Sequence, residues 1–123
     1  MQLKTQQRAS ILKVLDDFGR PATAQELLET ASFESPGLGL ATVYRALKHL
    51  VEAGEVRKID VAGVPPHYEM DRHKHHHFFV CEDCHKMFDL NGCSGGFTKL
   101  LPPGFTMNSH EVIIYGACKD CKS

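Results

Sequence analysis

Two matched cysteine pairs decide the fold of this chain: Cys81-Glu82-Asp83-Cys84 and Cys118-Lys119-Asp120-Cys121. Two residues separate the cysteines of each pair, so each pair can present both sulfur atoms to one metal ion. Four thiolates suit a tetrahedral Zn²⁺ ion, and two pairs are a stronger signal than a single CxxC. The pattern therefore predicts a structural zinc site made of Cys81, Cys84, Cys118 and Cys121.

Two other arrangements of these cysteines are open, namely two disulfides in a secreted domain or buried thiols without a ligand. No signal-peptide pattern precedes the cysteines, so we expect a cytoplasmic protein whose reducing surroundings keep thiols available for a metal ion. Apolar runs at residues 78–80 and 112–115 precede the two pairs, and both runs indicate strands. Zinc is therefore expected to fasten a small sheet that buries little core of its own.

The composition is that of a globular protein. The chain has 123 residues, of which 42% are hydrophobic and 24% charged, and its net charge is −1 with neutral histidines. This balance provides no overall basic surface for nucleic acid, although it is compatible with a local basic face. No apolar run is long enough to span a membrane, and no Gly-rich phosphate loop, HExxH motif or nucleophile elbow indicates an enzyme. We therefore expect neither a membrane nor a small organic substrate as a partner.

The first part of the chain predicts three helices followed by a β-hairpin. Apolar residues recur at helical spacing over residues 5–18 and 40–53, and Thr23 with Glu26 forms a capping box for a short helix between them. Residues 55–60 and 67–70 alternate in polarity around a turn-rich segment, which is typical of a hairpin. Three helices and a hairpin are the elements of a winged helix-turn-helix, whose third helix enters the DNA major groove.

The third predicted helix has a basic outer face. Residues 38–50 contain no acidic residue, and the side chains expected to point away from the core carry positive charge or hydroxyl groups. The residues predicted to contact operator DNA are Thr42, Tyr44, Arg45 and Lys48. A solvated helix face on a protein-binding module is the alternative interpretation of this charge pattern.

A polar segment divides the chain. Residues 71–74 contain no apolar side chain, so we place a DNA-binding domain at residues 1–70, a hinge at 71–75 and a second domain at 76–123. In the second domain, strands are expected at residues 75–80, 86–90 and 111–117, and a short helix at 97–101. The predicted fold class is α+β, with an N-terminal winged helix-turn-helix followed by a small α/β domain stapled by zinc.

Several segments of the sequence resemble the ferric uptake regulator (Fur) family of metal-dependent bacterial repressors. The segments are Gly39-Leu40-Ala41-Thr42-Val43-Tyr44-Arg45-Ala46-Leu47, Thr5-Gln6-Gln7-Arg8, Tyr68-Glu69-Met70 ahead of a histidine cluster, and Tyr115-Gly116-Ala117-Cys118-Lys119-Asp120-Cys121. The resemblance extends over essentially the whole chain. It implies a homodimer whose C-terminal α/β domain is the dimerisation domain, a structural zinc, and a separate regulatory metal site. It also implies a transcriptional repressor and not an enzyme.

The resemblance places the regulatory site at histidines 75–77 together with Glu69, Asp89 and His110. The sequence departs from the family pattern at Phe78 and Pro21, where many members have histidines. Residues i and i+2 of a strand face the same side, so His75 and His77 are expected to converge on one ion while His76 points away. We expect Cys93, in the loop after Asp89, and His110, at the start of the last strand, to approach them. The candidate regulatory ligands are Glu69, His75, His77, Asp89, Cys93 and His110.

A cysteine among histidines favours Zn²⁺ over Fe²⁺ or Mn²⁺, because thiolate is the softer ligand. We therefore expect a second Zn²⁺ site, in which the ion draws Glu69 towards the histidines and closes the dimer onto a palindromic operator. The alternatives are an iron-, manganese- or peroxide-responsive regulator of the same family, a zinc-stapled adaptor without a DNA role, and a zinc or thiol enzyme.

Overall fold

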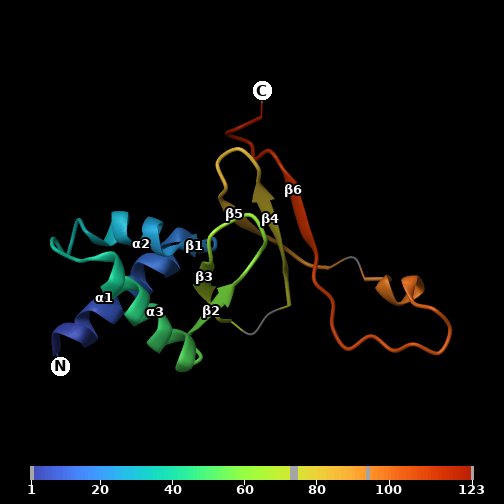
Figure 1. The fold of residues 1–123 in the computed structure, drawn as a ribbon, viewed down its shortest axis with the longest axis horizontal. Coiled ribbons are helices and arrows are strands. Elements are labelled where there is room, and N and C mark those ends of the chain that lie inside the picture. Colours follow the sequence, from blue (N-terminus) through green and yellow to red (C-terminus); the bar gives the residue numbers. More distant parts are fainter. Residues whose placement is uncertain (1, 73–74, 94, 123) are drawn as a thin grey trace. The chain divides into compact units, whose positions relative to one another are not determined.

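The chain forms two compact units, Met1–Lys74 and His75–Ser123. The computed structural model describes residues 2–72, 75–93 and 95–122, and the side chains of residues 6 onward in the first segment (Figure 1). The boundary between the units falls within the predicted hinge at 71–75. Residues 73 and 74 of that hinge lie outside the described residues, so the hinge and the domain limits stay predictions.

Three helices build the first unit: α1 (Gln2–Phe18), α2 (Ala24–Ala31) and α3 (Leu40–Glu52). The predicted capping box is confirmed at the start of α2. The Glu26 backbone N–H donates to Thr23 Oγ1 at 3.1 Å, and the Thr23 backbone N–H donates to Glu26 Oε1 at 3.0 Å. Two backbone donors that the helix leaves unpaired are thereby satisfied. Arg20 also pairs with Glu26 at 2.5 Å and fixes the turn that enters α2.

A small antiparallel sheet follows the helices. Its strands are β1 (Ala22–Thr23), β2 (Val56–Ile59) and β3 (His67–Met70), in the order β1-β3-β2. The hairpin of β2 and β3 confirms the predicted wing. Strand β1 was not predicted, because two residues are too few to show an alternating pattern.

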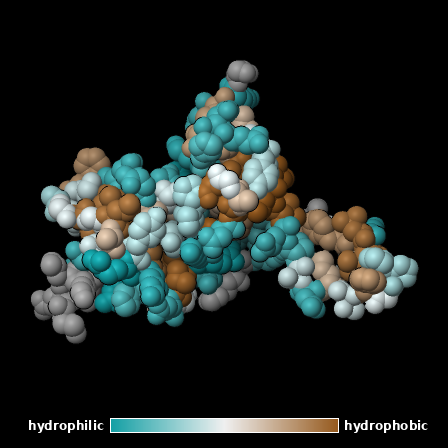
Figure 2. Space-filling model, in the orientation of Figure 1, coloured by the Kyte–Doolittle hydropathy of each residue, from teal (hydrophilic) through white to brown (hydrophobic). Residues whose placement is uncertain are grey.

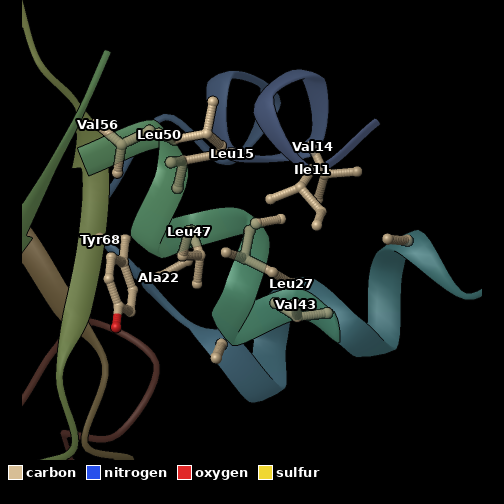
Figure 3. Packing of buried hydrophobic residues seen from close by; sticks show 13 residues of the cluster. Ile11, Val14, Leu15, Ala22, Leu27, Val43, Leu47, Leu50, Val56 and Tyr68 are labelled. Atoms are coloured by element: carbon tan, nitrogen blue, oxygen red, sulfur yellow. The ribbon is translucent and has the colours of Figure 1, made fainter. Parts of the chain in front are cut away.

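The helices and the sheet enclose a hydrophobic core (Figure 3). Each of the three helices contributes apolar side chains from one face, and Val56 and Tyr68 add the wing strands. On the predicted inner face of α3, Val43, Leu47 and Leu50 are buried and Val51 is half-buried. Burial of such a side chain contributes about 1.5–3 kcal/mol, so this face holds α3 on the domain and leaves the opposite face to solvent.

The second unit is a three-stranded sheet with strands β4 (His77–Cys81), β5 (Met87–Leu90) and β6 (Ile113–Gly116), in the order β5-β4-β6. Strand β4 pairs antiparallel with β5 and parallel with β6. The first and last strands are shorter than predicted, because β4 begins at His77 and β6 at Ile113. The helix expected at residues 97–101 is a 3₁₀ turn, η1 (Phe97–Leu100). These elements confirm the α+β class.

The segment that carries η1 exposes apolar side chains. Leu100 is 80% and Phe105 65% exposed, and Figure 2 shows hydrophobic atoms at the surface of this segment. Among the helices in the described part of the chain, none has both the length and the hydropathy needed to cross a membrane.

His67, the first residue of β3, is a polar side chain in a fully buried position. Its Nδ1 atom lies 2.8 Å from the Pro65 carbonyl oxygen, an acceptor, so Nδ1 carries the proton. Its Nε2 atom has no hydrogen-bond partner among the described residues. Burial lowers the pKa of His67 from its ordinary value, because a charged imidazole would lose its hydration there.

We expect the first unit to lose stability as pH falls below about 6.5, the pKa of an unfolded histidine. The unfolded state then binds a proton that folded His67 binds only at lower pH, so acid favours unfolding. Helical circular dichroism arises from the first unit, where the described α-helices lie, and thermal melts between about pH 7.5 and 5.5 would measure the effect. His67→Gln should show a smaller pH dependence. An identical pH dependence in the two proteins would contradict the assignment.

Candidate functional site

The two cysteine pairs meet because β4 and β6 are parallel and end at the same edge of the sheet. Cys81 is the last residue of β4 and lies opposite Gly116, the last residue of β6. The Glu82 backbone N–H donates to the Gly116 carbonyl at 2.7 Å and continues the pairing past the strand end. Cys84 and Cys118 then follow in the turns that leave the two strands.

The four sulfur atoms of Cys81, Cys84, Cys118 and Cys121 all lie within 4.8 Å of one another. None of the chain's five cysteines, all of them described, forms a disulfide. The Cys84 and Cys118 sulfur atoms are 3.9 Å apart. Tetrahedral Zn²⁺ with Zn–S bonds of about 2.3 Å places its sulfur ligands roughly 3.8 Å apart. The donor set therefore fits one zinc ion, and the identity of the metal stays a prediction.

Backbone amides prepare this site for thiolates. The Cys84 and Cys118 N–H groups point at the Cys81 sulfur at 3.5 and 3.4 Å, and they lower the pKa of Cys81 to about 6. In contrast, the neighbouring thiols of Cys118 and Cys81 raise the pKa of Cys121 to about 12. Four sulfurs this close cannot all be thiolates without a cation, and a divalent metal ion supplies that charge.

A second cluster of metal-binding side chains is formed by His75, His77, Cys93 and His110, whose ligand atoms all lie within 4.8 Å of one another. The Cys93 sulfur lies 3.4 Å from His77 Nε2 and 3.2 Å from His110 Nε2. The ring centroid of His75 lies 4.6 Å from that of His77 and 4.8 Å from that of His110. Three imidazoles and one thiol are a ligand set that zinc accepts in tetrahedral sites.

The surroundings of His77 favour its neutral form, which is the form that binds metal. Burial lowers the pKa of His77, and the nearby rings of His75 and His110 lower it further. The Val112 backbone N–H donates to His77 Nδ1 at 3.1 Å, so the proton of the neutral ring is on Nε2, facing Cys93. An ion bound at Nε2 would take the place of this proton, which makes metal affinity pH-dependent.

The cluster forms for a different reason from the one predicted. Because β4 begins at His77, His75 lies before the strand, and the alternation of a strand does not explain their convergence. His110 does not open the last strand either, since β6 begins at Ile113. The loops before β4, after β5 and before β6 bring the four residues together.

The structure separates Asp89, another predicted ligand, from this cluster. Asp89 lies on β5 opposite Phe78, and its Oδ1 atom is 3.0 Å from His76 Nε2. Glu69 belongs to the first unit, where it is buried and paired with Arg57 at 2.5 Å. Asp89 thus turns to His76 in this structure, and the parts of Asp89 and Glu69 in metal binding stay predictions.

Sequence reasoning missed two neighbours of these clusters. His76 was expected only to point away from His75 and His77, and in the structure it faces Asp89. Phe97, at the start of η1, packs its ring 4.5 Å from that of His110 and restricts how that imidazole can turn. Only the adjacency of three histidines hinted at a use for His76, and nothing in the sequence indicated Phe97.

The predicted DNA-contacting residues lie on the face of α3 away from the core. Tyr44, Arg45 and Lys48 are exposed and Thr42 is half-buried, so these side chains are available to a partner. Their contact with DNA stays a prediction.

Removing one cysteine from the four-cysteine cluster should release its zinc. We expect Cys84→Ser to lose one tightly held ion and to destabilise the second unit strongly, because the binding free energy of a structural metal contributes to folding. Zinc analysis after dialysis against a mild chelator, combined with thermal unfolding, measures both effects. Cys93→Ser is the matched control and should keep the chelator-resistant ion. Full zinc and an unchanged melting temperature in Cys84→Ser would rule out this site.

Comparisons with known proteins identify the family of this chain. The sequence pattern of the Ferric uptake regulator family matches residues 2–115. Over 121 residues, the chain is 30% identical to the peroxide-responsive repressor PerR of Staphylococcus saprophyticus subsp. saprophyticus, covering 96% of this chain and 81% of the relative.

Solved structures of the same family also resemble this chain. The Campylobacter jejuni peroxide stress regulator matches with a TM-score of 0.67 at 29% identity, over 98% of this chain and 92% of that one. FurB from M. tuberculosis, a zinc uptake regulator, matches with a TM-score of 0.52 at 30% identity, over 97% and 95% of the two chains. The chain therefore belongs to the ferric uptake regulator family, whose members are metal-responsive, DNA-binding transcriptional regulators and not enzymes.

Proposed function

We propose that this protein is a zinc-responsive repressor, and that the cluster of three histidines and Cys93 is its sensing site. The single observation that carries this proposal is the ligand set of His75, His77, Cys93 and His110 around one point. The four-cysteine cluster would hold a second, structural zinc. The protein would act in the cytoplasm as a homodimer on palindromic operator DNA.

The thiol in the sensing cluster supports zinc over iron or manganese. Thiolate is a soft ligand that strengthens zinc binding, whereas iron and manganese sites are commonly built from imidazole and carboxylate. Asp89, the carboxylate of the second unit that was expected in this site, pairs with His76 instead. A second candidate function is a peroxide-responsive regulator with iron at the histidine site. The similarity of the chain to a peroxide-responsive repressor supports it.

A homodimer is supported by the apolar surface of the second unit. Leu100, Phe105, Ile114 and Tyr115 are large hydrophobic side chains exposed to solvent in the single chain. Ile114 and Tyr115 lie on β6, which is an edge strand of the sheet. An exposed edge with apolar side chains is typical of a surface that another chain covers.

The ion would control DNA binding by holding parts of the second unit in one arrangement. His77 begins β4, whereas His75, Cys93 and His110 lie in three loops, and binding one ion requires all four at the same time. The ion supplies the positive charge that holds these donors together. A metal ion that binds the DNA-competent arrangement better shifts the population towards it. A coupling of about 1–3 kcal/mol would raise operator affinity roughly 5- to 150-fold.

Removing two imidazoles should abolish the metal response. We expect His75→Ala/His77→Ala to keep the structural zinc and the dimer, and to bind DNA equally with and without added zinc. The DNA would be a duplex selected from a random pool with the zinc-loaded wild-type protein, and fluorescence anisotropy would measure affinity. His85→Asn is the control histidine variant, because asparagine tolerates the positive φ of 63° at this position.

A double variant that still binds DNA more tightly when zinc is added would contradict this assignment. If His76→Ala then loses the zinc response, the sensor would lie at His76 and Asp89.

Replacing the thiol should change the choice of metal. We expect Cys93→Asp, which offers a carboxylate, to lower the preference for zinc over manganese by about tenfold or more, since oxygen is the harder ligand. The ratio of the zinc and manganese concentrations that half-saturate DNA binding measures this preference. An unchanged ratio would remove Cys93 from the sensing site.

A further inference from the structure

A small cavity lies between α1 and α3 on the first unit. Its volume is about 110 Å³, and it is lined by Gln7, Arg8, Thr42, Arg45, Ala46 and His49. Sites for drug-sized molecules have about 300–1,000 Å³, so this cavity admits a group of only a few atoms. The α3 residues that line it recur at intervals of three and four, and therefore form one stripe of the helix.

The chemistry of the lining indicates an anion. Arg8 and Arg45 bring two guanidinium groups from different helices, and His49 adds an imidazole. Gln7 and Thr42 add an amide and a hydroxyl, and no carboxylate is among the lining residues. A chain with a net charge of −1 thus concentrates positive charge at one point. Guanidinium groups match the geometry of phosphate oxygens and bind them with two parallel hydrogen bonds.

Arg45 is held on this stripe. Its Nη2 atom donates to Thr42 Oγ1 at 3.1 Å, which keeps the guanidinium along the helix surface beside the cavity. Tyr44 and Lys48, the other predicted DNA contacts, are not among the lining residues and form a separate pair four residues apart. The surface of α3 therefore presents two stripes with different chemistry.

We infer that this cavity binds one backbone phosphate of the DNA duplex, clamped between Arg8 of α1 and Arg45 of α3. This inference rests on the proposed function, because it needs DNA on α3. It assigns Arg45 to the phosphate backbone, whereas Tyr44 remains available for base edges. It also adds Arg8 and His49, which the sequence did not single out as DNA contacts. Phosphate contacts fix the position of a protein on DNA without reading its sequence.

The test compares two variants of α1, one that removes a charge inside the cavity and one that removes a charge outside it. Arg8→Ala removes a cavity residue, and Lys13→Ala removes an exposed charge of α1 that is not among the lining residues. Binding of the zinc-loaded full chain to the selected duplex and to an unrelated duplex is measured between about 50 and 200 mM salt. Arg8→Ala should weaken both complexes by a similar factor of about ten and make the salt dependence shallower by about one phosphate contact.

The comparison variants give distinct results. Lys13→Ala should keep the wild-type affinity and salt dependence. Arg8→Lys should keep most of the salt dependence but bind more weakly, because an ammonium group lacks the two-pronged geometry. Tyr44→Ala should lose preference for the selected duplex with an unchanged salt dependence. Circular dichroism melts check that every variant is folded.

Several outcomes would overturn the inference. Equal losses in Arg8→Ala and Lys13→Ala would show a general charge effect, and a loss confined to the selected duplex would show base reading. If inorganic phosphate binds the wild-type protein and Arg8→Ala leaves the DNA affinity unchanged, the cavity is a site for a free anion. If the zinc-loaded wild-type protein binds no duplex in the selection, the proposed function itself fails. If the wild-type protein binds and Arg8→Ala binds equally well, only the phosphate clamp is wrong.

Discussion

The parallel pairing of β4 with β6 is the interaction on which the second unit depends. It brings the ends of both strands to one edge, and Cys81 and Cys118 face each other there only because the strands run in the same direction. The buried side chains of this unit, within its described residues, are His77, Val80, Cys81 and Met87. A core this small stabilises a fold by only a few kcal/mol. Zinc bound by the four cysteines would therefore supply much of the folding free energy.

The same strand connects the four-cysteine cluster with the cluster proposed as the sensing site. His77 is the first residue of β4 and Cys81 is the last, so the two clusters contact opposite ends of a strand about 13 Å long. The structural ion would keep β4 in register with β6, and that register sets the position of Val112, whose N–H holds the His77 ring. The remaining sensing ligands lie on loops, which can rearrange at lower cost than strands. One site is thus suited to permanent occupancy and the other to exchange.

The first unit has a different construction, because an apolar core holds its helices and wing together. The residues that face DNA in our proposal, such as Arg8, Tyr44 and Arg45, take no part in that core. Affinity and specificity for DNA can therefore change by substitution without loss of the fold. The basic surface is also local, since the chain as a whole carries a net charge of −1.

The sequence by itself determined the features that depend on neighbours along the chain. Thr23 with Glu26, the apolar spacing of α3, the wing hairpin and the two CxxC pairs each specify local geometry, and all appear in the structure. Only the tertiary structure decided which side chains share a site. His77, Cys93 and His110 meet through loops, Asp89 selects His76, and Arg8 approaches Arg45 across two helices. These contacts join residues far apart in the chain, and their geometry follows from strand register and helix packing, which no local pattern encodes.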